Sequence, residues 1–177
     1  MSSKGSDPEH DFFLTGAELY LEIEEAVAEF RRQVQEKCRR VVEGRLDEIG
    51  QACQMEWTSN ALSDYKYGWP EGRHIGKQLS IKSFGNLYFC LDLYRENGSI
   101  VYLALVYLYR RNAGLAAGLW PLLGTSPAAG GYREGNNLYF GRWMTKDQVP
   151  DFEEFLNGAV DDFIAFISKG GGLKKHI

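Results

Sequence analysis

The sequence predicts an α+β fold, in which an antiparallel sheet of about four to five strands carries a long N-terminal helix and a C-terminal amphipathic helix packed on one face. Three observations lead to this prediction. A helical apolar pattern runs through the first third of the chain, an Asn-Gly turn joins two apolar runs in the middle, and a second helical pattern follows. Strands and helices do not alternate along the chain, so a parallel sheet is not expected.

The first helix is predicted to begin at Thr15. Thr15 and Glu18 form a capping box, and Leu14 and Leu19 stand at the positions of a hydrophobic staple. Apolar residues spaced by three and four then continue to Cys53. One helix of roughly 40 residues would be about 60 Å long, whereas a compact domain of this size measures about 40 Å. We therefore expect a break or kink near Gly44; the alternative is one long helix that pairs with a second copy as a homodimer.

The centre of the sheet is predicted from Asn97 and Gly98, which favour a two-residue type I′ turn because both residues tolerate positive φ. This turn fixes the register of the two flanking strands. The predicted opposed pairs on one face are Leu93 with Tyr102, Leu91 with Ala104, Phe89 with Val106 and Leu87 with Leu108. On the other face they are Tyr94 with Val101, Asp92 with Leu103, Cys90 with Leu105, Tyr88 with Tyr107 and Asn86 with Tyr109. The first face is almost wholly apolar and belongs in the core, while the second combines apolar side chains with phenols.

The regions around this hairpin have weaker signals. Residues 58–77 are rich in Ser, Asn, Asp, Gly and Pro, so we expect a long connection with one short strand. Residues 112–135 are small and Gly-rich, which favours a strand or turn and then a mobile loop over residues 124–135. The segment "NLYFGRWM" at residues 137–144 alternates as a strand, and it echoes "GNLYFC" at residues 85–90. We interpret the echo as two strands in the same environment, because so few residues do not make a repeat.

The last helix has a full apolar stripe between Phe152 and Ile167, with acidic residues on its other side. Thr145 and Gln148 offer a capping box, although Pro150 suits the first turn of a helix that begins later. The predicted organisation is a flexible lead over residues 1–13, a single α+β domain over residues 14–169, and a flexible tail over residues 170–177.

Composition bounds the class of protein. The chain has 177 residues, a net charge of -4 and a hydrophobic share of 44%, which suits a globular domain with its own core. The longest apolar run, residues 100–109, is about half of what a membrane-spanning helix needs. The polar N-terminus does not resemble a secretory signal, so we expect a cytoplasmic location and no membrane partner. Cys38, Cys53 and Cys90 are far apart and are predicted to be buried thiols rather than a disulfide or zinc site.

No pattern in the sequence carries recognisable chemistry. A phosphate loop is excluded because Glu71 occupies the required glycine position and Gln78 follows Lys77. The serines do not lie in a nucleophile elbow. We therefore predict no catalytic residue, metal ligand or cofactor, and the interpretation favours a non-enzymatic protein.

Charge is unevenly distributed along the chain. Residues 1–77 hold ten basic and fifteen acidic residues, residues 78–146 hold seven and three, and residues 147–177 hold three and six. The middle segment is too weakly basic to identify a nucleic-acid binder.

Three functional hypotheses follow. The first is a bacterial or phage-type interaction protein that regulates another macromolecule, most simply a protein, through the phenol-rich sheet face and the loop at residues 64–77, because Tyr, Trp and Arg dominate interface energetics. The predicted partner-binding residues are Tyr65, Tyr67, Trp69, Arg73, His74, Lys77, Tyr88, Tyr94, Tyr107 and Tyr109.

The second hypothesis is a single-stranded nucleic-acid binder that stacks bases on Tyr65, Tyr67 and Trp69 and holds phosphates with Arg73 and Lys77. The third is a small-ligand protein or enzyme with titrating groups at Glu71, His74 or Asp92. Asp92 is notable because the register places it opposite Leu103, where a buried carboxylate needs a partner such as an arginine.

Overall fold

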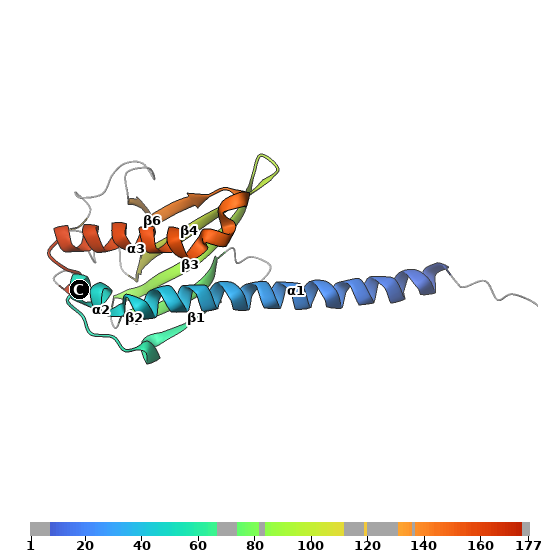
Figure 1. The fold of residues 1–177 in the computed structure, drawn as a ribbon, viewed down its shortest axis with the longest axis horizontal. Helices are drawn as coiled ribbons and strands as arrows, with labels where there is room; N and C mark the ends of the chain where they lie inside the picture. Colours follow the sequence, from blue (N-terminus) through green and yellow to red (C-terminus); the bar gives the residue numbers. More distant parts are fainter. Residues whose placement is uncertain are drawn as a thin grey trace, which may run out of the picture. The chain divides into compact units, whose positions relative to one another are not determined.

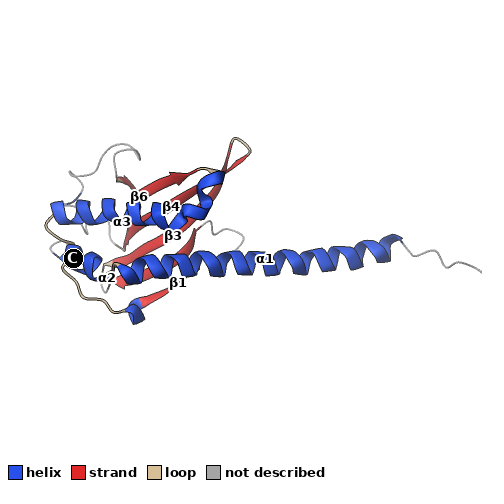
Figure 2. Cartoon of the chain, in the orientation of Figure 1, coloured by secondary structure: helices blue, strands red, loops and turns tan. Residues whose placement is uncertain are grey.

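A computed structural model describes residues 8–66, 74–81, 84–111, 119, 131–135 and 137–174 of the chain. Figures 1 and 2 show the order of its helices and strands. The elements are α1 (Pro8–Gly44), α2 (Leu46–Cys53), η1 (Ser59–Ala61), β1 (Leu62–Lys66), β2 (His74–Ile81), β3 (Gly85–Glu96), β4 (Ser99–Arg110), β5 (Tyr132–Glu134), β6 (Asn137–Met144), η4 (Lys146–Asp151) and α3 (Phe152–Lys169). The predicted α+β class, with a long N-terminal helix and a C-terminal helix on the sheet, is confirmed.

The sheet has six antiparallel strands in the order β1-β2-β3-β4-β6-β5, one more than the upper prediction. Two strands were not predicted. Residues 58–81 form both β1 and β2 where a connection with one strand was expected, and β5 lies in residues 124–135, where a mobile loop was expected. The missed signal is the alternation of Ile75, Lys77, Leu79 and Ile81 with small or polar residues. Turn-forming residues before His74 masked that alternation.

The predicted hairpin register is confirmed at every pair, from Glu96 opposite Ser99 to Asn86 opposite Tyr109. Asn97 has φ 50° and Gly98 has φ 83°, as a type I′ turn requires. The shared "NLYF" segments flank β4 symmetrically, because Tyr88 and Tyr139 both lie opposite Tyr107. The echo in the sequence therefore reflects two strands in equivalent surroundings.

One face of the sheet carries the main core under α3. A row of residues across four strands, Lys77, Phe89, Val106 and Phe140, lies on this face. Phe140 contacts Phe163 of α3 edge to face, with ring centroids 5.5 Å apart. The buried side of α3 consists of Phe152, Leu156, Ala159, Val160, Phe163 and Ile167. These are the residues that the apolar stripe predicts.

Charged contacts attach the last turns of α1 and the start of α2 to α3. Glu153 accepts hydrogen bonds from Lys37, at 3.4 Å, and from Arg40. Arg45 pairs with Asp161 at 2.7 Å and also donates to the Asn157 carbonyl at 3.1 Å. These contacts fix the helical layer in which Val34, Cys38, Val41 and Val42 are buried.

Local sequence signals predicted some of the helix ends correctly and others incorrectly. The predicted break is confirmed, since α1 ends at Gly44 and α2 begins at Leu46. The predicted start at Thr15 is wrong, because α1 begins at Pro8. Proline is favourable in the first turn, where its missing N–H has no helical partner, and this earlier signal prevails over the capping box. At α3 the capping box of Thr145 and Gln148 is present but opens η4, and the regular helix begins at Phe152 after Pro150.

The chain divides into two compact units, residues 1–33 and residues 34–177. In the first unit the described residues form the N-terminal part of α1. The second unit contains the sheet, α2 and α3. In this second unit Leu173 is fully buried, and Gln54 donates to the Gly171 carbonyl at 3.1 Å, so residues 170–173 are packed where a flexible tail was expected.

Candidate functional site

The second face of the sheet is built from aromatic rings and small apolar side chains. We call it the tyrosine face; its members are Tyr65, Tyr88, Cys90, Leu103, Leu105, Tyr107 and Tyr139. Tyr88 and Tyr107 stack with ring centroids 4.3 Å apart, and Tyr65 lies 4.4 Å from Tyr88. Gly76 occupies the position between Tyr65 and Cys90, where a Cβ would lie 2.0 Å from the Phe89 carbonyl oxygen. Only glycine fits this close approach of the two strands.

Hydrogen bonds satisfy the phenols of this face. Tyr107 donates to the Tyr65 hydroxyl oxygen at 2.7 Å. Asn86 donates to the Tyr88 oxygen at 2.8 Å, and Asn137 donates to the Tyr139 oxygen at 2.7 Å. Burial raises the pKa of Tyr107 far above its ordinary value, and the Cys90 thiol and the Tyr65 hydrogen bond act in the same direction. Tyr107 is therefore a neutral structural donor at physiological pH.

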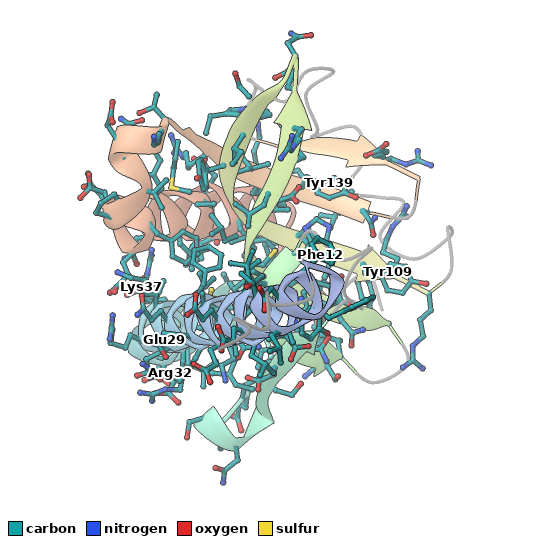
Figure 3. The ribbon with its side chains drawn as sticks, turned by 90° about the vertical axis from the view of Figure 1, so that its right-hand side faces the viewer. Phe12, Glu29, Arg32, Lys37, Tyr109 and Tyr139 are labelled. Atoms are coloured by element: carbon teal, nitrogen blue, oxygen red, sulfur yellow. The ribbon has the colours of Figure 1, made fainter. Side chains whose placement is uncertain are left out.

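The side chains of the predicted partner-binding residues differ in how deeply they are buried. Tyr65, Tyr88 and Tyr107 are at most 8% exposed, as expected of core residues. Tyr94 is half-buried against the edge of Trp143. Tyr109 is exposed, and Figure 3 labels it with Tyr139. Burial of this kind supports the interpretation that the first three rings stabilise the fold, and any role of theirs in partner binding stays a prediction.

The residues of the single-strand hypothesis are not brought together in the described part of the chain. Lys77 lies on the helix-covered face and pairs with Asp64 at 2.5 Å, whereas Tyr65 lies on the tyrosine face. Tyr67, Trp69, Arg73 and Glu71 fall outside the described residues, as does most of the segment at residues 112–135.

His74 and Asp92, the two titrating groups named from the sequence, are direct cross-strand neighbours. His74 Nδ1 and Asp92 Oδ1 lie 3.4 Å apart, a distance that makes an ion pair when the imidazole is protonated. The imidazole also lies beside the rings of Tyr65 and Tyr107, with centroids 6.0 Å and 5.5 Å away. The partner of Asp92 is thus a histidine rather than the arginine that the sequence suggested.

The three cysteines are buried and not bonded to one another, as predicted. Burial raises the pKa of Cys53 to about 12, and burial also raises the pKa of Cys38 and of Cys90. A thiol must be ionised to act as a nucleophile, so these side chains are inert at neutral pH.

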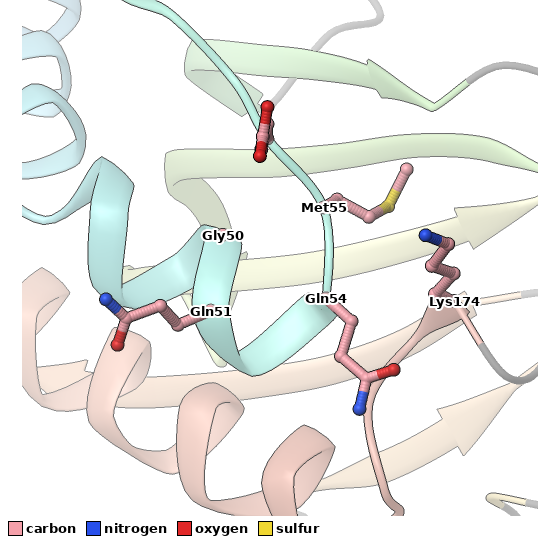
Figure 4. Close-up of a pocket in the computed structure, with 6 residues that line it drawn as sticks. Gly50, Gln51, Gln54, Met55 and Lys174 are labelled. Atoms are coloured by element: carbon pink, nitrogen blue, oxygen red, sulfur yellow. The ribbon is translucent and has the colours of Figure 1, made fainter.

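Two shallow hollows lie on the second unit. One, of about 560 Å³, is lined by Gly50, Gln51, Gln54, Met55, Glu56 and Lys174 (Figure 4). The other, of about 420 Å³, lies beside α3 between Arg142 and Asp161. Neither hollow is lined by His74, Asp92 or a cysteine. Within the described ranges, His, Cys, Asp and Glu do not gather in threes as metal ligands would, and none of the described helices is long and apolar enough to cross a membrane.

Most of the large exposed apolar side chains of the described residues lie on α1, for which the sequence analysis offered only pairing of a long helix with a second copy. Of ten large apolar side chains that are exposed in the described residues, seven fall between Phe12 and Ile23. Phe12 is 72% exposed, Leu19 55% and Ile23 53% (Phe12 is labelled in Figure 3). Single exposed apolar side chains are ordinary, but such a concentration makes this part of α1 a candidate interaction surface.

Three of these side chains, Phe12, Leu19 and Ile23, lie on a regular helical stripe that continues to the half-buried Phe30. Phe12, Gly16, Leu19, Ile23, Ala26 and Phe30 follow one another at steps of four and three residues. We call this set the exposed stripe. The spacing places all six on one side of the helix, with Leu14 and Leu21 on the opposite side. The sequence did contain a signal for this stripe, because the helical apolar pattern is longer than a compact domain of this size is wide.

The helix around the exposed stripe is strongly acidic. Residues 8–33 hold seven acidic and two basic residues, a net charge of -5 with histidine neutral. Arg32 donates two hydrogen bonds of 2.7 Å to Glu29, and Gln33 donates a third (Figure 3). These bonds, that of Arg32 first, lower the pKa of Glu29 to about 2. Tyr20 donates to Glu24 at 2.5 Å.

No family model matches the chain, and neither a curated protein nor a solved structure matches it.

Proposed function

We propose that this protein is a non-enzymatic interaction protein that binds another protein through the exposed stripe of α1. The supporting observation is the concentration of large apolar side chains at more than half exposure between Phe12 and Ile23. A helix of this kind gains most of its stability from packing of its apolar side, and a partner would supply that packing.

The magnitudes are consistent with specific binding. Burial of a fully exposed large apolar side chain contributes about 1.5–3 kcal/mol. Because Phe12, Leu19 and Ile23 are 72%, 55% and 53% exposed, their burial supplies roughly 3–5 kcal/mol before the costs of association. Micromolar affinity corresponds to about 8 kcal/mol. Phe12, Leu19 and Ile23 therefore supply about half of the binding free energy of a micromolar complex, and the rest of the interface must supply the remainder and offset the association costs.

The test compares two substitutions of equal exposure on opposite sides of the helix. Ile23→Asp places a charge in the exposed stripe, and Leu21→Asp places the same charge on the other side. We expect a photoreactive residue at position 19 to cross-link a protein partner in the native host, and Ile23→Asp to abolish that adduct while Leu21→Asp preserves it. Equal adducts in both variants would refute the proposal.

A second candidate function is a small-ligand site at His74 and Asp92, favoured by the 3.4 Å separation of their side chains. A histidine oriented by a carboxylate is a common acid-base arrangement. A thermal-shift screen of small anions and metabolites would test it, with hits expected for the native chain and lost in both His74→Ala and Asp92→Asn. Hits that persist in either variant would place the ligand elsewhere.

A further inference from the structure

We propose that the segment bound by the exposed stripe is an amphipathic helix whose apolar side is flanked by lysine or arginine. This inference rests on the proposed function and names its partner class. Two features carry it: the heptad spacing of the stripe and the excess of acidic residues around it.

The spacing of the stripe indicates that the bound segment is a helix. The steps from Phe12 to Phe30 alternate between four and three residues, which is the heptad pattern by which helices pack side by side. Phe13, Tyr20 and Val27 widen the stripe along one edge, also at intervals of seven. A strand would match this surface poorly because its side chains repeat every second residue.

The acidic residues around the stripe indicate that the bound helix has basic residues beside its apolar side. Glu22 and Glu29 line one edge of the stripe seven residues apart, and Glu24 stands at the other edge. Glu18 and Glu22, and likewise Glu25 and Glu29, are like charges four residues apart. Each such pair destabilises a helix by mutual repulsion. A partner with basic flanks relieves this repulsion and forms ion pairs across the interface.

The same charge disfavours the two other occupants of an apolar helix. A second copy would bring a further charge of -5 against the first, since residues 8–33 hold seven acidic and two basic residues. Helices that lie in membrane surfaces carry lysine and arginine on their polar side and are drawn to anionic lipids, the reverse of this helix.

The test uses three synthetic peptides of three heptads each. All share leucine and isoleucine at the core positions, and they differ only in having lysine, glutamine or glutamate at the flanking positions. Binding to the whole chain is followed by fluorescence anisotropy at low and high salt. We expect the lysine peptide to bind at least about tenfold more tightly than the glutamine peptide, a difference of about 1.4 kcal/mol. High salt should reduce that advantage, and the glutamate peptide should not bind.

Variants of the chain separate specific contacts from general attraction. Ile23→Asp should lose the lysine peptide and Leu21→Asp should retain it. A triple variant, Glu22→Lys, Glu24→Lys and Glu29→Lys, should reverse the preference and bind the glutamate peptide.

The other possible outcomes show whether the charge inference alone is wrong or the proposed function as well. Equal binding of the glutamine and lysine peptides would overturn the charge inference and leave the proposed function standing. Lysine-peptide binding that survives Ile23→Asp would overturn both. A chain that forms dimers in sedimentation equilibrium, with Ile23→Asp monomeric, would make a second copy the occupant. Binding to phosphatidylcholine vesicles that Ile23→Asp abolishes would make it a membrane, and either result overturns the inference.

Discussion

Residues 12–30 of α1 and the helix α3 carry the same kind of apolar pattern in opposite surroundings. In α3 the pattern is buried, and Phe163 and Ile167 are 0% exposed, whereas Phe12 at the same helical spacing is 72% exposed. Spacing therefore tells which side of a helix is apolar, and it does not tell whether the chain itself covers that side. The structure is needed to show whether other residues of the chain bury that apolar side.

The acidic residues of the two helices differ in the same way. In α3, Glu153 pairs with Lys37 and Arg40, Asp161 pairs with Arg45, and Asp162 pairs with Arg142. These cations come from other elements of the fold. In residues 8–33, Glu29 pairs with Arg32 of the same helix. The comparison supports a partner that brings both apolar and basic groups to α1.

The largest expected effect comes from truncating one aromatic ring in each stripe. Phe163→Ala should lower the free energy of unfolding by about 3–5 kcal/mol, because it removes a buried ring and leaves a cavity. Phe12→Ala should change it by less than about 0.5 kcal/mol. Urea denaturation measures both. A loss at Phe12 comparable with that at Phe163 would mean that the chain buries its own exposed stripe in solution.

The next effect separates a buried from an exposed hydroxyl within the sheet. Tyr107→Phe should cost about 1–2 kcal/mol, since it removes a buried hydrogen bond and leaves the Tyr65 hydroxyl to find another partner. Tyr109→Phe serves as the matched control on the same strand and should be nearly neutral. Thermal unfolding of the two variants decides the point, and equal melting temperatures would show that water reaches the Tyr107 hydroxyl.

A smaller effect compares two helical glycines. A Cβ at Gly16 meets nothing within 4 Å, whereas a Cβ at Gly158 lies 3.2 Å from Nε of Arg142. Gly16→Ala should strengthen the helix by about 0.5–1 kcal/mol, seen as slower amide exchange around residue 16. Gly158→Ala should gain less, because Arg142 must move from its contacts with Asp162 and the Gly158 carbonyl. A larger gain at Gly158 would contradict this explanation.

The smallest effect is a titration without a large change in stability. The two hydrogen bonds from Arg32 hold the pKa of Glu29 near 2, compared with an ordinary value of 4.5. A lowered pKa means that the contribution of this pair is present above pH 4.5 and is lost as pH falls through about 2. Carboxyl NMR should show a midpoint near 2 in the native chain and a midpoint shifted up toward 4.5 in Arg32→Ala, where only the hydrogen bond from Gln33 remains. An unchanged midpoint in the variant would assign the shift to Gln33.

Single local signals predicted two features of the fold correctly, although the capping box at Thr15 misplaced the start of α1. Asn97 and Gly98 determined the register of the central hairpin, and Gly44 marked the break between α1 and α2. The sequence interpretation missed β2, because the turn-forming residues before His74 outweighed the alternation after it. The cross-strand pairing of His74 with Asp92 was not predictable for the same reason, since it depends on a strand that the sequence interpretation omitted. The sequence showed that the first helical pattern is too long for a compact domain. Only the structure shows that the apolar side chains in its first half are exposed.

The position of α3 also bears on how the chain is made. The ribosome synthesises all six strands before α3, which covers the core side of Phe89, Val106 and Phe140. Until residues 152–169 have left the exit tunnel, that side lacks the helix that shields it. Nascent chains stalled before this point should therefore need chaperones, whereas those stalled after it should not.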